Sequence, residues 1–323
     1  AAVTILGVMA APIMLKSGYD ARLSAGSIAA GGTLGMLIPP SVMLVVMGPV
    51  VGAPITELFA AAVIPGVMLA TLYALYAVGR CYLNPSLGPV LPMDQRAKSV
   101  GEIMRELYFG ILPLAFLIFA VLGSILAGLA TPTDAAAMGA LGSLVLAVVY
   151  RRLTWEKLKE AVFSTIVTSS MILLLVAAAN FYGSVFARLG TASMIANTLL
   201  QLPFPPTIIL LLILAMIFLL GWPLEWVPIV LIVIPIFMPL IEALQIDLVW
   251  FATLVAICLQ TAWLSPPVAL SAYYIKGVVP EWSLGDIYMG MMQFMVIQVI
   301  GLLLVLFFPI IALWLPGVLF RGG

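Results

Sequence analysis

The residues best suited to chemistry are small, polar and turn-forming, and they stand in the middle of two apolar stretches. The first group is residues 31–41 (GGTLGMLIPPS), inside an apolar run of membrane length from about residue 25 to 47. The second is residues 260–268 (QTAWLSPPV), inside a run from about residue 249 to 275. Proline removes a backbone donor and clashes with the preceding turn, so neither run can form one continuous helix. Each is predicted to be two half-helices around an unwound segment.

Unwound backbone at membrane depth indicates function, because its polar groups cannot face lipid and are tolerated only inside protein or along a cavity. The two segments also share flanks. Pro12 and Pro235 lie upstream, and Glu57 and Asp286 lie downstream. Two unrelated proline kinks would not explain these matching flanks. Paired interrupted helices in two halves of a chain point to the binding site of a secondary transporter.

Carbonyl and hydroxyl oxygens at such breaks suit Na⁺, whereas N–H groups at the start of a half-helix favour an anion. The predicted Na⁺ ligands lie at the first break, at a turn between two apolar arms (residues 221–225) and at the second break: Gly31, Gly32, Thr33, Gly35, Gly221, Glu225, Gln260 and Thr261. The predicted solute-binding residues surround the two Pro-Pro pairs: Pro39, Pro40, Ser41, Ser265, Pro266 and Pro267. No other cofactor is predicted.

Each candidate has a structural alternative. Thr33 and Ser41 are explained equally well as helix caps at the break. Glu225 is a carboxylate at membrane depth, so it either serves the cation site, carries a proton, or caps the second apolar arm. Asp134 follows Thr131 and Pro132, which form a good helix start, so a structural role for Asp134 is favoured.

Composition defines the class of protein. The chain has 323 residues, of which 64% are hydrophobic and 8% charged, against about 25% charged residues in soluble domains. This composition predicts an all-α polytopic membrane protein, and a net charge of zero argues against a nucleic-acid partner. The chain has no histidine and its acids are isolated, which argues against a membrane-embedded enzyme. A channel would be expected to show a polar pore stripe, which the sequence lacks.

Loop charge predicts the topology. Residues 207–220 and 226–241 are each shorter than the roughly 20 residues that span a bilayer, so together they are predicted to form a re-entrant hairpin. Residues 3–15 are predicted to be the second arm of another hairpin, whose first arm would precede the chain. If both hairpins are re-entrant, the Lys and Arg residues gather in loops on one side of the membrane, and of the 13 only Arg188 and Arg321 lie elsewhere. Because basic loops face the cytoplasm, that side is predicted to be cytoplasmic. The predicted fold therefore has inverted repeats, each with one re-entrant hairpin and one broken helix.

Residues 31–41 resemble the signature of the large membrane subunit of tripartite ATP-independent periplasmic (TRAP) transporters. Residues 131–137 (TPTDAAA), 221–226 (GWPLEW) and 264–268 (LSPPV) resemble other motifs of that family, in the same order. The resemblance covers the whole chain. Residues 260–279 are most similar to the branch named for mannitol or chloroaromatic compounds.

The resemblance implies an elevator mechanism driven by a Na⁺ gradient in the bacterial inner membrane. Residues 1–55 and 207–280 would form the transport domain, and residues 56–206 and 281–323 the scaffold. The implied partners are a periplasmic binding protein, which delivers a small organic solute, usually a carboxylate, and a small four-helix membrane subunit. That subunit would be separate or fused on the N-terminal side. The alternative is a stand-alone ion-coupled carboxylate carrier of related architecture.

Overall fold

A computed structural model describes residues 2–90, 99–266, 269–320 and 322, and these form helices and turns without a strand. Two compact units make up the chain: a first unit of Ala1–Val90 with Ala178–Gly323, and a second unit of Leu91–Ala177. In the described ranges, six helices are long and apolar enough to cross a membrane: Ile55–Leu83, Val100–Leu126, Pro132–Val149, Trp155–Phe186, Trp226–Ala243 and Leu284–Phe307. The protein is thus a multi-pass helical membrane protein, as its composition predicts. The boundaries of the two units differ from the predicted division into transport domain and scaffold, which stays a prediction.

The N-terminal part of the first unit contains the first predicted break. It comprises α1 (Ala2–Lys16), α2 (Ala21–Leu34), α3 (Val42–Val51) and α4 (Ile55–Leu83). The break runs from Gly35 to Ser41. The sequence predicted that it would begin at Gly31, four residues earlier than it does. Gly31 and Gly32 stay in the last turn of α2, because a glycine lowers helix stability by only about 1 kcal/mol, whereas the Pro-Pro pair stops the helix outright.

The C-terminal part of the first unit repeats that order of elements. After the last turns of α8 it continues through α9 (Thr191–Leu200), α10 (Pro206–Leu220), α11 (Trp226–Pro228), η4 (Ile229–Val233), α12 (Ile234–Ala243), α13 (Leu248–Leu264), α14 (Leu270–Val278), α15 (Leu284–Phe307) and α16 (Ile310–Phe320). The second break thus lies between α13 and α14, as predicted. The stretch from α11 to α12 has 18 residues, so this arm is longer than predicted and reaches a membrane-spanning length. Its re-entrant course stays a prediction.

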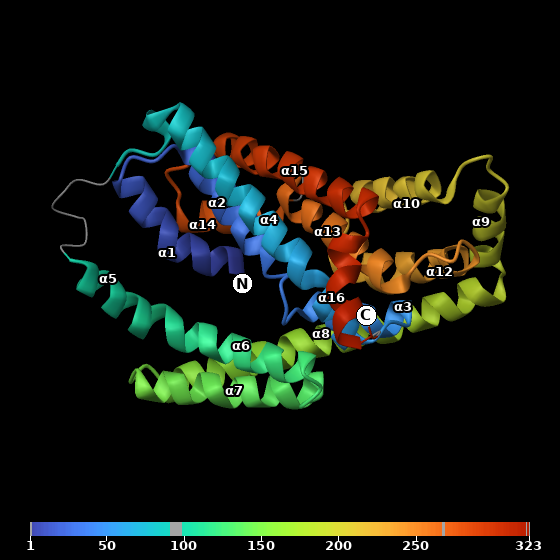
Figure 1. Cartoon of the computed structure of the whole chain (residues 1–323), viewed down its shortest axis with the longest axis horizontal. Coiled ribbons are helices and arrows are strands. Elements are labelled where there is room, and N and C mark those ends of the chain that lie inside the picture. The colour runs from blue at the N-terminus through green and yellow to red at the C-terminus, as the bar shows by residue number, and fades with distance from the viewer. Residues whose placement is uncertain (1, 91–98, 267–268, 321, 323) are drawn as a thin grey trace. The chain divides into compact units, whose positions relative to one another are not determined.

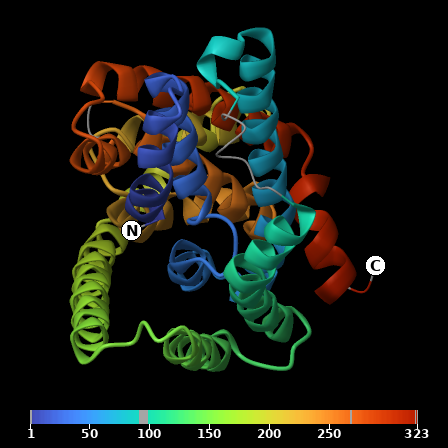
Figure 2. The same ribbon diagram turned by 90° about the vertical axis from the view of Figure 1, so that its left-hand side faces the viewer.

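In the first unit, helices of the N-terminal part pack against helices of the C-terminal part. Helix α1 packs against α14 and α12 packs against α3, so each arm contacts the second half-helix of the other part. Likewise α2 packs against α15, and α13 packs against α4. Figure 1 shows α2 and α15 close together although they are far apart in the sequence. In Figure 2 the blue N-terminal helices lie beside orange and red helices from the C-terminal part.

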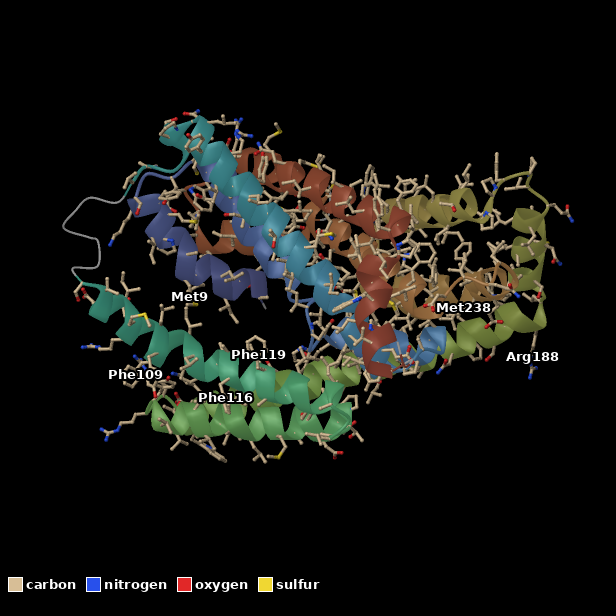
Figure 3. The ribbon with its side chains drawn as sticks, viewed as in Figure 1. Met9, Phe109, Phe116, Phe119, Arg188 and Met238 are labelled. Carbon is tan, nitrogen blue, oxygen red and sulfur yellow. The ribbon has the colours of Figure 1, made fainter. Side chains whose placement is uncertain are left out.

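The second unit consists of helices with large exposed apolar side chains. A continuous helix, formed by α5 (Val100–Glu106), η3 (Leu107–Ile111) and α6 (Leu112–Leu126), is followed by α7 (Pro132–Val149) and the first part of α8 (Trp155–Arg188). Figure 3 labels three exposed side chains on the first of these helices: Phe109, Phe116 and Phe119. Such surfaces are expected where helices face lipid or other membrane helices.

Helix α7 begins as predicted. The Thr131 hydroxyl accepts a hydrogen bond from the Asp134 N–H at 3.2 Å and donates one to the Asp134 carboxylate at 2.6 Å. Pro132 occupies the first helical position. Asp134 therefore has a structural role at the N-terminus of α7, where it also meets the positive end of the helix dipole.

Candidate solute and cation site

A cavity of about 240 Å³ lies beside the first break. Both parts of the first unit line it, because the start of α1 and the break contribute most of the wall and two tryptophans from the C-terminal part complete it. The lining residues are Ala2, Val3, Gly32, Thr33, Gly35, Met36, Pro40, Ser41, Val42, Met43, Trp226 and Trp263. A Cβ atom on Gly32 would lie 2.8 Å from the Cα of Val3, so only glycine lets α1 approach this closely.

The hydroxyl groups of this cavity donate their hydrogens to the backbone. Thr33 donates to the carbonyl of Ala30 at 2.8 Å, and Ser41 donates to the carbonyl of Met36. Ser41 is also the N-cap of α3, since its oxygen accepts from the Leu44 N–H at 3.5 Å. Both side chains are buried. With the hydrogen used internally, each hydroxyl can offer only lone pairs to a ligand, as a cation requires.

The hydroxyl groups at the second break also donate their hydrogens to backbone carbonyls. Thr261 donates to the carbonyl of Cys258 at 2.5 Å, and Ser265 donates to the carbonyl of Thr261 at 2.7 Å. Thr261 and Ser265 are both buried. The two breaks therefore match in hydroxyl chemistry although their sequences share little beyond the Pro-Pro pair.

Several carbonyls near the breaks lose their helical donors. The N–H groups of Gly35 and Met36 donate to the carbonyl of Thr33. They are therefore not the donors to the carbonyls of Gly31 and Gly32 that a regular helix would supply. Pro39 and Pro266 have no N–H to offer to the carbonyls four residues before them, those of Gly35 and Ala262. Carbonyls released in this way are the oxygens that broken helices use to coordinate Na⁺.

A second cavity of about 190 Å³ lies at the turn between α10 and α11. Gly221, Pro223, Leu224, Glu225, Ala262, Trp263 and Leu270 line it. A Cβ atom on Gly221 would lie 2.9 Å from the Cβ of Ala262, so the turn sits directly on the end of α13. Glu225 is the N-cap residue of α11 but its side chain makes no capping hydrogen bond, and it is exposed. The side chain of Glu225 therefore does not cap α11 in this structure.

Trp263 lines both cavities and thus stands between them. Its ring packs on that of Tyr274 with centroids 6.2 Å apart. Its indole Nε1 is buried and makes no hydrogen bond. The sequence shows that Trp226 and Trp263 are near the turn and the break, but only the folded chain places them beside the first break.

A buried polar network lies behind the second break. Gln298 of α15 donates through Nε2 to the Oε1 of Gln260 at 2.9 Å and to the carbonyl of Ile257 at 3.0 Å. The Tyr73 hydroxyl of α4 donates to the Oε1 of Gln298. Sequence reasoning overlooked Gln298, although a glutamine inside an apolar span is itself a signal of interhelical hydrogen bonding.

The structure brings only some of the predicted site residues together. Gly32, Thr33, Gly35, Pro40 and Ser41 share the first cavity, and Gly221 and Glu225 share the second. The remaining predicted residues lie at or near the breaks without lining either cavity: Gly31, Pro39, Gln260, Thr261, Ser265 and Pro266. Pro267 lies outside the described residues. The ligand roles of all these residues stay predictions.

The chain matches one known family over most of its length. Residues 1–311 match the family model described as the DctM component of the tripartite ATP-independent periplasmic transporter. The chain belongs to this DctM family. The chain is 30% identical to the 2,3-diketo-L-gulonate TRAP transporter large permease protein YiaN of Escherichia coli strain K12, over 92% of this chain and 68% of YiaN.

Two further relatives illustrate the range of solutes in the DctM family. The C4-dicarboxylate TRAP transporter large permease protein DctM of Pseudomonas aeruginosa is 28% identical over 98% of this chain and 73% of its own length. The sialic acid TRAP transporter permease protein SiaT of Haemophilus influenzae is 26% identical over 97% of this chain and 50% of SiaT. This DctM chain is thus a TRAP large subunit, in a family of transporter permeases rather than enzymes. Its assignment to the mannitol or chloroaromatic branch stays a prediction.

Proposed function

We propose that this DctM chain carries a small organic carboxylate across the bacterial inner membrane, driven by a Na⁺ gradient. The observation that supports Na⁺ most directly is the hydroxyl arrangement at the two breaks. Thr33, Ser41, Thr261 and Ser265 all donate to backbone carbonyls, so their free lone pairs suit a cation. Neither break contains an ionisable side chain, which disfavours protons as the coupling ion.

The proposal includes an elevator mechanism in a transporter built from inverted repeats. If the two parts are copies of one motif related by a twofold axis, the second arm of each copy should contact the second half-helix of the other. The contacts of α1 with α14 and of α12 with α3 fit this expectation. In this proposal, both hairpins are re-entrant and residues 1–55 and 207–280 move as a transport domain. The scaffold is formed by residues 56–206 and 281–323. This topology puts nearly all basic residues in cytoplasmic loops, as the positive-inside rule expects, and the rule therefore supports it.

The proposed assembly has three components. A periplasmic binding protein delivers the solute, and a small four-helix membrane subunit, separate or fused to the N-terminal side of this chain, enlarges the scaffold. The exposed apolar side chains of the second unit, such as Phe116 and Phe119, provide a surface for lipid and for such membrane helices. Membership of a tripartite family supports this assembly.

Proteoliposomes test the proposal. The full-length subunit would be reconstituted with its small subunit, and uptake of solute measured with and without the binding protein under a Na⁺ gradient or a pH gradient. We expect uptake only with the binding protein and the Na⁺ gradient. Uptake that ignores Na⁺ and follows the pH gradient would reject Na⁺ coupling. Robust uptake without the binding protein would indicate a stand-alone carrier instead.

A further inference from the structure

We propose that an apolar groove between α6 and α7 holds one acyl chain of an anionic phospholipid, and that the adjoining basic loop, residues 151–159, binds its headgroup. The groove measures about 620 Å³, and all of its lining residues belong to the second unit. It shares no residue with the candidate solute and cation site. A lipid bound here would therefore be a further ligand of the protein, distinct from the solute and from the coupling ion.

The groove follows the contact between α6 and α7, which run side by side (Figure 1). A Cβ atom on Gly142 would lie 2.4 Å from the Cδ1 of Leu117, so glycine at this position lets the two helices approach closely. Residues 113–124 of α6 and 135–146 of α7 contribute most of the lining. The groove therefore runs along both helices rather than across them.

The lining of the groove suits hydrocarbon. Of the lining side chains that the structure describes, only that of Ser124 is polar, and its hydroxyl donates to the carbonyl of Val121 at 2.8 Å. The lining side chains of Phe116, Met138 and Val145 are largely exposed. A polar solute placed here would lose its hydrogen bonds to water without gaining others, whereas an acyl chain has none to lose.

The dimensions of the groove fit an acyl chain better than a helix. Its lining on α7 runs from Ala135 to Leu146, which spans about 17 Å at 1.5 Å per residue. That is slightly more than half of the roughly 30 Å hydrocarbon core, the depth that the chains of one leaflet fill. A volume of about 620 Å³ spread over this length gives a width of about 7 Å, whereas a helix with its side chains is about 10–12 Å wide.

One end of the groove lies next to the basic loop. Leu146 lines that end, and Tyr150 follows one helical turn later. The Tyr150 hydroxyl donates to the carbonyl of Phe109, which joins the end of α7 to the helix that contains α6. The loop that follows connects the candidate spans Pro132–Val149 and Trp155–Phe186, so it lies at the membrane surface, where lipid headgroups are.

The charge of the basic loop complements an anionic headgroup. Its four basic side chains are all exposed: Arg151, Arg152, Lys157 and Lys159. In the part of the chain that the structure describes, none of the four forms an ion pair, although the loop also contains Glu156. The Nζ of Lys157 lies 3.4 Å from the carbonyl oxygen of Arg152, so charges from both ends of the loop come close together. Basic residues next to a membrane span attract anionic lipids, and an exposed Trp155 is typical of the headgroup level.

Native mass spectrometry of the purified full-length subunit, assembled with its small subunit in detergent, measures how many lipids bind and how tightly. The three probes are dioleoyl phosphatidylglycerol, which is anionic, dioleoyl phosphatidylcholine, which has the same chains but no net charge, and inorganic phosphate, which has no chains. We expect phosphatidylglycerol to bind at least about tenfold more tightly than phosphatidylcholine, since each nearby cation contributes about fivefold. Phosphate should not displace the lipid.

Substitutions in the basic loop test the headgroup contacts. The double variant Arg151→Gln, Arg152→Gln should weaken phosphatidylglycerol binding about fivefold for each charge removed, and leave phosphatidylcholine binding unchanged. Arg188→Gln is the matched control, because Arg188 is an exposed arginine at the other end of α8. It should change the binding of neither lipid.

A substitution in the groove tests the acyl-chain contacts. Val145→Trp fills part of the groove and should weaken the binding of both lipids about fivefold, as expected for the loss of about ten carbon–carbon contacts. Val148→Trp is the matched control on α7, since Val148 is 57% exposed, close to the 60% of Val145, but does not line the groove. It should change the binding of neither lipid.

Equal affinity for the two lipids, or phosphatidylglycerol binding that is unchanged in the double arginine variant, would overturn the proposed headgroup site. Displacement of the lipid by phosphate, or equal binding in Val145→Trp and Val148→Trp, would overturn the proposed acyl-chain site. If Val145→Trp does not assemble, the comparison of phosphate with the two lipids on the unmodified protein decides the role of the chains. These titrations contain no solute and no gradient, so their failure would leave the proposed transport function unaffected.

Discussion

The side chains of Gln260 and Gln298 meet inside the first unit, where the Nε2 of Gln298 donates a hydrogen bond to the Oε1 of Gln260 at 2.9 Å. Both side chains are completely buried. Gln260 lies in the last turns of α13, so this bond holds α15 to α13 just before the second break. Tyr73 adds α4 to the same network through its hydroxyl.

Replacing Gln298 by Leu should destabilise the protein, because the buried Tyr73 hydroxyl and the Gln260 amide would lose their partner. The expected loss in free energy of unfolding is about 1–3 kcal/mol for each orphaned group. Thermal unfolding of the purified full-length subunit measures it. Gln293→Leu is the matched control on α15, since Gln293 is half-buried and bonds only the Tyr76 hydroxyl, at 2.8 Å, among the interactions described. Equal effects of the two substitutions would contradict a special role for the Gln260–Gln298 bond.

Thr33→Ala and Thr261→Ala should each raise the Na⁺ concentration needed for half-maximal uptake. Loss of one oxygen ligand worth about 1–2 kcal/mol corresponds to a factor of a few to tens. Thr33→Ser keeps the hydroxyl and should behave like the unmodified protein. Thr71→Ala is the control, because Thr71 makes the same kind of bond to the Val67 carbonyl at 2.8 Å on an exposed part of α4. Unchanged Na⁺ dependence in both alanine variants would remove these threonines from the cation site.

Glu225→Gln should slow uptake but leave it dependent on Na⁺. Glu225 lines the second cavity with an exposed side chain, so its removal changes the local charge without removing the oxygens at the breaks. Uptake would be measured against Na⁺ at fixed pH and then against pH at fixed Na⁺. Glu242→Gln, an exposed acid on α12, serves as the control. Uptake that follows pH alone and disappears in Glu225→Gln would identify Glu225 as a proton carrier.

Gly290→Ala should force α2 and α15 apart. A Cβ atom on Gly290 would lie 2.0 Å from the carbonyl oxygen of Arg22, which is far inside van der Waals contact. Overpacking of this kind costs about 1–3 kcal/mol or more, and thermal unfolding would show it as a lower midpoint. Gly79→Ala on α4 has nothing within 4 Å of the new methyl group, so it should be neutral or slightly stabilising. A Gly290→Ala protein as stable as the Gly79→Ala protein would show that the helices separate freely.

The proposed hairpin of α10 to α12 makes a prediction about sidedness. Cysteines introduced at Phe204 and Gln245, both exposed, should be labelled from the periplasmic side by a membrane-impermeant reagent. The background would carry alanine at Cys81 and Cys258, the two native thiols. A cysteine at Lys157 should be labelled only from the cytoplasmic side and calibrates the assay. Labelling of positions 204 and 245 from opposite sides would mean that this segment crosses the membrane.

Local rules in the sequence determined where helices begin, end and break. Thr131 with Pro132 starts α7, and the Pro-Pro pair at residues 39–40 interrupts an otherwise apolar run, as predicted. These outcomes depend on a few neighbouring residues, because capping and proline sterics act within about one helical turn. The exact extent of the first break was predicted less well, since the glycines of α2 only weaken a helix and neighbouring contacts decide whether it continues.

Only the tertiary structure decided which residues meet at the candidate site. Trp263 lines the first cavity although it follows the first break by more than two hundred residues in the sequence. Gln298 bonds to Gln260 from a different helix. The direction of each hydroxyl hydrogen also emerged only with the backbone around it, as for Thr33 and Ala30. Periodicity and capping describe one helix at a time, whereas these contacts depend on how separate helices pack, and packing is set by side-chain shapes along the whole interface.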